Sequence, residues 1–181
     1  MLASRLQYLA LAYFSRPKSD REVYRAIRKH GCHRFLEIGV GRGLRAQRMI
    51  DLALACHPQD QVRYVGIDLF EARPEPAGGL SLKEAHRLFK ARGIATQLVP
   101  GDPFSALARA ANALREIDLV LISADQDAAL LERAWFYLPR VLHPGSLLFQ
   151  ERANPDGTLS VIALDRADVE ARARKPQRRA G

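Results

Sequence analysis

The chain has 181 residues, 48% of them apolar and 27% charged, which is ordinary for one globular domain with a single hydrophobic core. The net charge of +8 permits attraction to nucleic acid without establishing it. No run approaches the ~20 apolar residues of a membrane-spanning helix, so we expect no membrane association. Cys32 and Cys56 match no zinc-binding spacing and are interpreted as free thiols of a cytoplasmic protein.

Residues 2–14 are predicted to form an amphipathic helix that packs on the domain. They are not interpreted as a signal peptide, because Gln7 interrupts the apolar run and no small-residue cleavage site follows. A second helix is expected to follow, with Ser19 or Asp20 as its capping residue. Residues 1–31 are therefore expected to form N-terminal helices that pack on the core.

Strand-like and helix-like segments alternate along the rest of the chain. Strands are predicted at residues 34–39, 62–68, 95–99, 118–122 and 146–150. Helical patterns lie between them, at residues 44–55, 81–92, 103–114 and 127–141. Residues 158–164 are a candidate for one more strand, antiparallel to the fifth. Residues 166–181 are rich in arginine and are expected to form a basic, flexible tail.

This alternation predicts an α/β fold, a Rossmann-like doubly wound and mostly parallel sheet with helices on both faces. The C-terminal strand region is expected to be shortened, because only 30 residues follow Glu151. In such sheets ligands bind outside the carboxyl ends of the strands, where the strand order reverses. The residues just after each strand are therefore the candidates for a functional site.

The first strand runs into a glycine-rich turn, Glu37-Ile-Gly39-Val-Gly41-Arg-Gly43. Glycines allow a tight turn and a close approach of a ligand to the backbone, and the following helix offers free N–H groups. The run from Gly41 to Ala46 also fits the dinucleotide pattern GxGxxA, so an NAD site is one alternative and a turn without a ligand is another. An acid such as Glu37 suits the ammonium and sulfonium of S-adenosylmethionine better than a pyrophosphate.

Several motifs together resemble the class I S-adenosylmethionine-dependent methyltransferases. The glycine turn resembles their first motif, and Gly66-Ile-Asp68 resembles their second. Pro100-Gly-Asp102 is similar to the acid position that faces the adenine in that family. The runs at 118–125 and 143–149 resemble the fourth motif and the "LxPGG" turn with the fifth strand. These matches cover about residues 34–151, in the right order.

The resemblance implies that residues 32–165 form an S-adenosylmethionine-binding domain. Its cofactor contacts would come from Glu37, Gly39 and Gly41 at the methionine end, Asp68 at the ribose and Asp102 at the adenine. Gly43, Leu69 and Ser123 are further candidates for contact with the cofactor. Three alternatives stay open at these positions. Asp102 could instead cap the next helix, Glu71 could replace Asp68, and Phe70 could either flank the adenine or belong to the core.

The nearest subgroup is the catechol-type small-molecule O-methyltransferases, which include enzymes with a catalytic metal. Ser123 stands where their first ligating Asp is expected, and Glu151-Arg152 replaces their Asp-Asn pair, so we predict no catalytic metal. Asp125 is the best candidate for a general base and Glu151 the second, although each could instead be a helix cap or a surface acid. Positioning alone can also support methyl transfer to a nucleophilic atom.

The resemblance thus implies a methyltransferase that acts on a small-molecule acceptor. An alternative is a non-catalytic protein that binds S-adenosylmethionine or S-adenosylhomocysteine, which Ser123, Arg152 and the short region after the fifth strand favour. A nucleic-acid methyltransferase is a further alternative, because of the positive charge. The sequence indicates neither the acceptor nor the oligomeric state.

Overall fold

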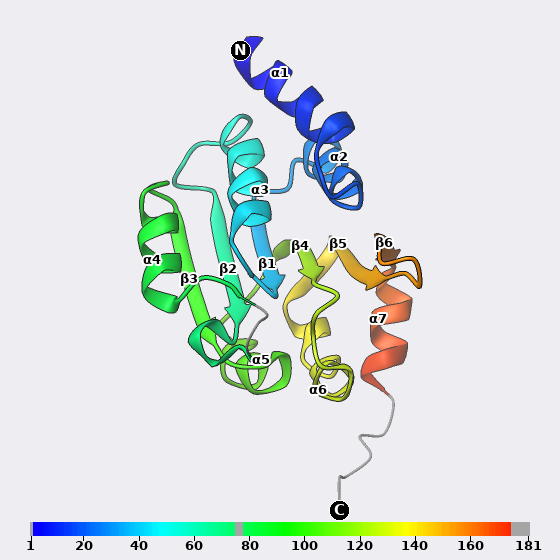
Figure 1. Cartoon of the computed structure of the whole chain (residues 1–181). Helices are drawn as coiled ribbons and strands as arrows, with labels where there is room; N and C mark the ends of the chain where they lie inside the picture. The colour runs from blue at the N-terminus through cyan, green and yellow to red at the C-terminus, as the bar shows by residue number, and fades with distance from the viewer. Residues whose placement is uncertain (1, 75–77, 175–181) are drawn as a thin grey trace, which may run out of the picture.

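One six-stranded sheet forms the centre of the molecule (Figure 1). The computed structural model describes residues 2–74 and 78–174. The strand order is β3-β2-β1-β4-β5-β6, and all neighbours are parallel except β5 and β6. The strands are β1 (Arg34–Ile38), β2 (Arg63–Asp68), β3 (Ala95–Pro100), β4 (Ile117–Ile122), β5 (Leu142–Ala153) and β6 (Leu159–Leu164). This topology confirms the predicted α/β fold, including the sixth strand antiparallel to the fifth.

Helices cover both faces of this sheet. One face packs against α2 (Asp20–His30), α3 (Leu44–Leu54) and α4 (Leu82–Lys90). The other packs against α5 (Pro103–Ala110), α6 (Ala128–Ala134) and α7 (Arg166–Ala173). Successive residues of a strand point to opposite faces. Accordingly Phe35 belongs to the first core and Leu36 to the second, and both are fully buried.

Two helices are shorter than their predicted ranges. The pattern predicted one helix over 127–141, but α6 ends at Ala134 and a 3-10 turn, η3 (Leu138–Arg140), follows. Pro139 lies inside η3, where it has no N–H to continue an α-helix and disfavours the helical conformation of the residue before it. Helix α5 likewise ends at Ala110 instead of residue 114.

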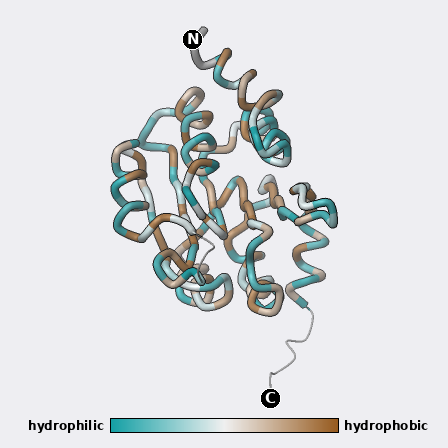
Figure 2. The backbone as a smooth tube through the Cα atoms, in the orientation of Figure 1, coloured by the Kyte–Doolittle hydropathy of each residue, from teal (hydrophilic) through white to brown (hydrophobic). Residues whose placement is uncertain are grey.

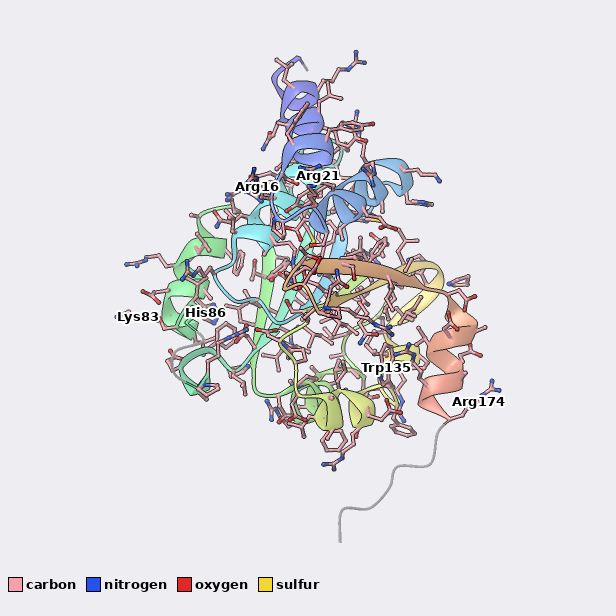
Figure 3. The ribbon with its side chains drawn as sticks, turned by 45° about the vertical axis from the view of Figure 1, so that its right-hand side comes forward. Arg16, Arg21, Lys83, His86, Trp135 and Arg174 are labelled. Atoms are coloured by element: carbon pink, nitrogen blue, oxygen red, sulfur yellow. The ribbon has the colours of Figure 1, made fainter. Side chains whose placement is uncertain are left out.

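The C-terminal segment differs from the predicted flexible tail. Residues 166–173 form α7, which begins with a capping box between Asp165 and Asp168. Val169 is buried in the second core, and the Arg172 guanidinium lies 4.7 Å from the ring centre of Trp135 (Figure 3 labels Trp135). The prediction of a tail was wrong for these residues because it weighed only their charge. The rest of the predicted tail, 175–181, lies outside the described residues.

The N-terminal helix α1 (Leu2–Leu9) continues into a π-helical turn, η1 (Ala10–Phe14), and extends from one end of the molecule (Figure 1). Figure 2 shows apolar and polar residues alternating along it. Tyr8 and Leu11 pack against the first core, whereas Leu6 and Phe14 are exposed. No helix in the described part of the chain is long and apolar enough to cross a membrane.

Candidate functional site

The glycine turn after β1 lies where the strand order reverses, between β1 and β4. Gly39, Gly41 and Gly43 have φ values of 95°, 56° and 70°, in the left-handed region that favours glycine. A Cβ added to Gly41 would meet no atom within 4 Å, so the backbone there faces open space. A Cβ on Gly39 would lie 2.5 Å from Cβ of Ser123 and 2.6 Å from Nε2 of Gln126. The turn is therefore packed against the loop after β4 at its start and open at its middle.

Asp68 ends β2 beside this turn, and its carboxylate is fully hydrogen bonded. The N–H groups of Gly41 and Phe70 donate to it at 2.8 and 2.9 Å, and Arg73 donates twice, at 2.6 Å each. Burial raises the pKa of Asp68, but the bonds from Arg73, Gly41 and Phe70 lower that pKa below its ordinary value. Asp68 is therefore ionised and holds both the glycine turn and Arg73.

The same guanidinium of Arg73 also reaches Asp125, at 2.7 Å. The Arg73 side chain is 13% exposed, whereas that of Asp125 is 48% exposed. This ion pair joins the segment after β2 to the loop after β4. Gln126 donates to the other oxygen of Asp125 at 2.7 Å.

Asp102 caps helix α5, which was the predicted alternative to an adenine contact. Its carboxylate accepts hydrogen bonds from the N–H groups of Phe104 and Ser105, at 2.9 and 3.0 Å. Burial raises the pKa of Asp102, but the bonds from Ser105 and Phe104 lower that pKa below its ordinary value. Asp102 nevertheless lines the same cavity as Asp68.

Glu71 and Phe70, which follow the end of β2, also have defined positions. The Glu71 carboxylate accepts a hydrogen bond from the N–H of Leu82, at 2.9 Å, and so holds the start of α4. Phe70 is 3% exposed and packs in the first core, as the core interpretation expected. Asp68, not Glu71, is therefore the acid at the end of β2 beside the glycine turn.

Glu37 lies at the end of β1 and has no exposed surface. Arg45, in the first turn of α3, donates to Glu37 at 2.9 Å, to Glu151 at 3.1 Å and to Asp20 at 3.4 Å. A further nitrogen of Arg45 donates to Oγ of Ser123 at 2.7 Å. One guanidinium thus holds carboxylates from α2, β1 and β5, and we call these four charged residues the Arg45 cluster.

The charges of the Arg45 cluster are unequal, with three carboxylates around one cation. Burial raises the pKa of Glu37 and of Asp20, and the nearby Arg45 partly offsets this. Burial lowers the pKa of Arg45, but the three carboxylates raise that pKa above its ordinary value. Tyr64 donates to the second oxygen of Glu37 at 2.6 Å. Sequence patterns predicted Glu37 and Glu151 separately, but nothing in the spacing indicated that Arg45 and Asp20 would join them.

Two cavities adjoin the turn. The first has a volume of about 170 Å³, and its lining includes Asp68, Leu69, Arg73, Asp102 and Asp125. The second has a volume of about 220 Å³, and its lining includes Gly39, Gly41, Gly43, Arg45, Ser123, Asp125 and Glu151. Of the residues predicted to contact a cofactor, only Glu37 lines neither cavity. Both predicted base candidates line the second, and Asp125 lines both.

A protein-bound metal ion needs several ligating side chains close together. Within residues 2–74 and 78–174, no three His, Cys, Asp or Glu side chains gather in an arrangement that could hold a metal ion. Ser123 and Glu151 instead contact Arg45, a cation that occupies this end of the site.

Comparisons with known proteins show which solved structures resemble this fold. No family model matches the sequence, and no curated protein matches it. Solved structures do match, including an O-methyltransferase from Bacillus cereus in complex with SAH (TM-score 0.57, 14% identity, 86% of this chain and 68% of that chain). A candidate O-methyltransferase from Klebsiella pneumoniae gives a TM-score of 0.58 at 17% identity, over 86% of this chain and 64% of that one.

A candidate caffeoyl-CoA O-methyltransferase from Staphylococcus aureus gives a TM-score of 0.55 at 11% identity, over 82% of this chain and 64% of that one. This chain therefore spans less than two thirds of the Klebsiella and Staphylococcus proteins. At these identities the likeness shows a shared fold. The chain has the Rossmann-like fold of these methyltransferases.

Proposed function

We propose that the chain binds S-adenosylmethionine across the two cavities and transfers its methyl group to a small-molecule acceptor. The observation that carries this proposal is the open glycine turn at the point where the strand order reverses. Carboxylates lie on both sides of this turn, and one cavity adjoins it on each side. Neither cavity alone reaches the ~300 Å³ of a typical small-molecule site, but together they do. The shared fold with methyltransferases supports the same proposal.

The residues that line the two cavities fit S-adenosylmethionine on one condition. Asp68 would accept the ribose hydroxyls, but Arg73 now donates to both oxygens of its carboxylate. Arg73 must therefore release Asp68 when the cofactor binds. Asp102 and Leu69 line the same cavity and would lie on the adenine side.

The second cavity would take the methionine end. Its lining includes Arg16, Arg42 and Arg48 as well as Arg45, and these are the cations near the place of the cofactor's carboxylate. Asp20, Asp125 and Glu151 also line it and suit an ammonium or sulfonium. Glu37 lies behind Arg45 and would act by holding that guanidinium, not by contact. This differs from the direct contact that the family resemblance implied.

The bound cofactor would supply an electrophilic methyl group, and the protein would have to position the acceptor and remove its proton. Asp125 is the better base candidate, because its side chain is 48% exposed and its Oδ2 loses its partner when Arg73 moves. Glu151 is 5% exposed and bonded to Arg45, Ser19 and the N–H of Ala124. A carboxylate this buried and this fully bonded is not within reach of an acceptor's proton.

A second candidate function is cofactor binding without methyl transfer. It is favoured by the ion pairs of both base candidates, since Asp125 pairs with Arg73 and Glu151 with Arg45. Turnover with a panel of hydroxylated small molecules would separate the two functions once binding is established.

The first test is calorimetric titration with S-adenosylmethionine, S-adenosylhomocysteine and NADH. We expect both adenosyl ligands to bind and the Asp68→Ala variant to bind them more weakly. Asp60→Ala, an exposed acid in the turn before β2, is the matched control and should bind as the wild type does. Absence of binding by both adenosyl ligands would refute the proposal, and binding of NADH alone would favour the dinucleotide alternative.

A further inference from the structure

A third cavity lies at the opposite edge of the sheet, where the strands begin. It has a volume of about 330 Å³ and is lined by residues from the first halves of β1, β2 and β3 and from 113–117. The glycine turn lies at the carboxyl ends of the same strands, so this cavity is separate from the proposed cofactor site. Helix α5 ends at Ala110, and the turn that follows it forms one side of the cavity.

Arginines from three segments line the third cavity: Arg34, Arg63 and Arg115. Arg34 and Arg63 are register partners on the parallel strands β1 and β2, so their side chains leave the same face of the sheet side by side. Like charges directly opposite each other in a sheet are destabilising. Two adjacent cations at this position therefore attract a negative charge.

The protein supplies only part of that negative charge. Glu116 has an unusual positive φ of 57° and pairs with Arg34. Arg63 and Arg115 have no side-chain hydrogen bond or ion pair to any residue that the structure describes. The cavity therefore keeps an excess of two positive charges.

One donor in this cavity is also unsatisfied. Nε of Arg34 is buried and has no hydrogen-bond partner in the described structure. A buried donor without a partner is unfavourable in the folded state, and an acceptor from a ligand would relieve this. The floor beneath it is apolar, since Val65, Leu114 and Ile117 are buried there. The site thus offers guanidinium groups above an apolar surface.

We propose that the third cavity binds a phosphate group. Guanidinium groups match phosphate oxygens through paired hydrogen bonds, and a doubly charged phosphate neutralises the two unpaired arginines. The apolar floor would receive the remainder of the ligand. The phosphate can belong to a small phosphorylated molecule or to a nucleic-acid backbone, and the experiment distinguishes these sources.

The test is a titration followed by backbone amide NMR with three probes: inorganic diphosphate, AMP and a single-stranded DNA oligonucleotide. We expect saturable shifts at residues 95–97 and 113–117. We expect Arg63→Gln and Arg115→Gln each to weaken binding about tenfold or more, because each removes a charge-assisted bond. Arg5→Gln, which removes an exposed positive charge from α1, is the matched control and should bind as the wild type does.

The probes identify the source of the phosphate. Saturation by diphosphate or AMP, with no tighter binding of the oligonucleotide, indicates a small phosphorylated molecule. Tighter, steeply salt-dependent oligonucleotide binding that Arg63→Gln weakens indicates a nucleic-acid backbone. Absence of shifts at residues 113–117, shifts confined to the glycine turn, or equal affinities of Arg63→Gln and Arg5→Gln would each overturn the proposal.

Discussion

Arg73 donates to both carboxylate oxygens of Asp68, with both distances at 2.6 Å. This is a two-bond arginine–carboxylate pair, the strongest kind of charge-assisted contact between side chains. The Arg73 guanidinium, which lines the first cavity, also bonds Asp125, which lines both cavities. If the chain binds S-adenosylmethionine as proposed, Arg73 and the ribose of the cofactor therefore compete for the carboxylate of Asp68.

The first prediction concerns this competition. We expect Arg73→Gln to bind S-adenosylhomocysteine about tenfold more tightly than the wild type, because the variant no longer has to break a charge-assisted pair before binding. Isothermal calorimetry measures the affinity directly. Lys83→Gln removes a positive charge from the exposed side of α4 (Figure 3) and should leave the affinity unchanged. Equal or weaker binding by Arg73→Gln would mean that Arg73 contributes to the site instead of closing it.

The fold was predictable because its signals are local and repeated. Each strand is a short apolar run such as 118–122, and each of the first four is followed by a helical pattern, so the order of elements follows from neighbouring residues. The errors occurred where a local rule competed with packing. Residues 166–173 look like a charged tail, but Val169 and Arg172 pack against Trp135, which is far away in the sequence.

The candidate site was only partly predictable, for a related reason. Motif spacing placed Gly39, Asp68 and Ser123 near one another, because strand ends meet at one edge of a parallel sheet. Which cations pair with the acids of the site depends on long arginine side chains that reach from one element to another. Arg73 reaches Asp125 over 52 residues, and Arg45 reaches Glu151 over 106 residues. No periodicity in the sequence encodes such contacts.

The second prediction concerns the Arg45 cluster. Arg45→Gln leaves three buried carboxylates without their cation, and breaking a buried ion pair in this way costs about 3–5 kcal/mol. We therefore expect the free energy of unfolding, measured by urea denaturation at pH 8, to fall by that order. The double variant Arg45→Gln/Glu37→Gln should recover part of the loss, since it removes the most deeply buried charge. No recovery would show that packing of Arg45, not charge, stabilises the cluster.

The third prediction follows from the pKa values of the same cluster. Burial raises the pKa of Glu37 and Asp20 above their ordinary values of 4.5 and 3.8. Such groups bind protons more tightly in the folded state, so their contribution to stability is full below the ordinary pKa and is lost as pH rises through the raised pKa. Without Arg45 both pKa values rise further. The stability deficit of Arg45→Gln should therefore shrink as pH falls from 8 to about 5, as urea denaturation at each pH would measure.

The fourth prediction separates the two roles of Asp102. Asp102 is the capping residue of α5, so Asp102→Ala should lower the free energy of unfolding by about 0.5–2 kcal/mol. Asp102→Asn should keep most of the wild-type stability, because Asn is a comparable cap. Thermal or urea unfolding measures both. If Asp102 also contacts the adenine, both variants weaken S-adenosylhomocysteine binding. If it is a cap alone, Asp102→Asn binds as the wild type does.

The fifth prediction tests whether α7 belongs to the folded domain. Trp135 is the single tryptophan of the chain and is 1% exposed beside α7, so its fluorescence reports on the docking of this helix. Val169→Ala should reduce stability by about 1–3 kcal/mol. Val169→Asp should place an unpaired charge in the second core, release α7 and shift Trp135 emission to longer wavelength.

Arg174→Ala is the matched control for both Val169 variants. Arg174 lies just after α7, its side chain is 80% exposed, and its pair with Glu170 is a surface contact of little energetic weight (Figure 3). It should leave both stability and Trp135 emission unchanged. Wild-type emission from Val169→Asp would show that Trp135 is shielded without α7, and the helix would then be a dispensable addition to the six-stranded core.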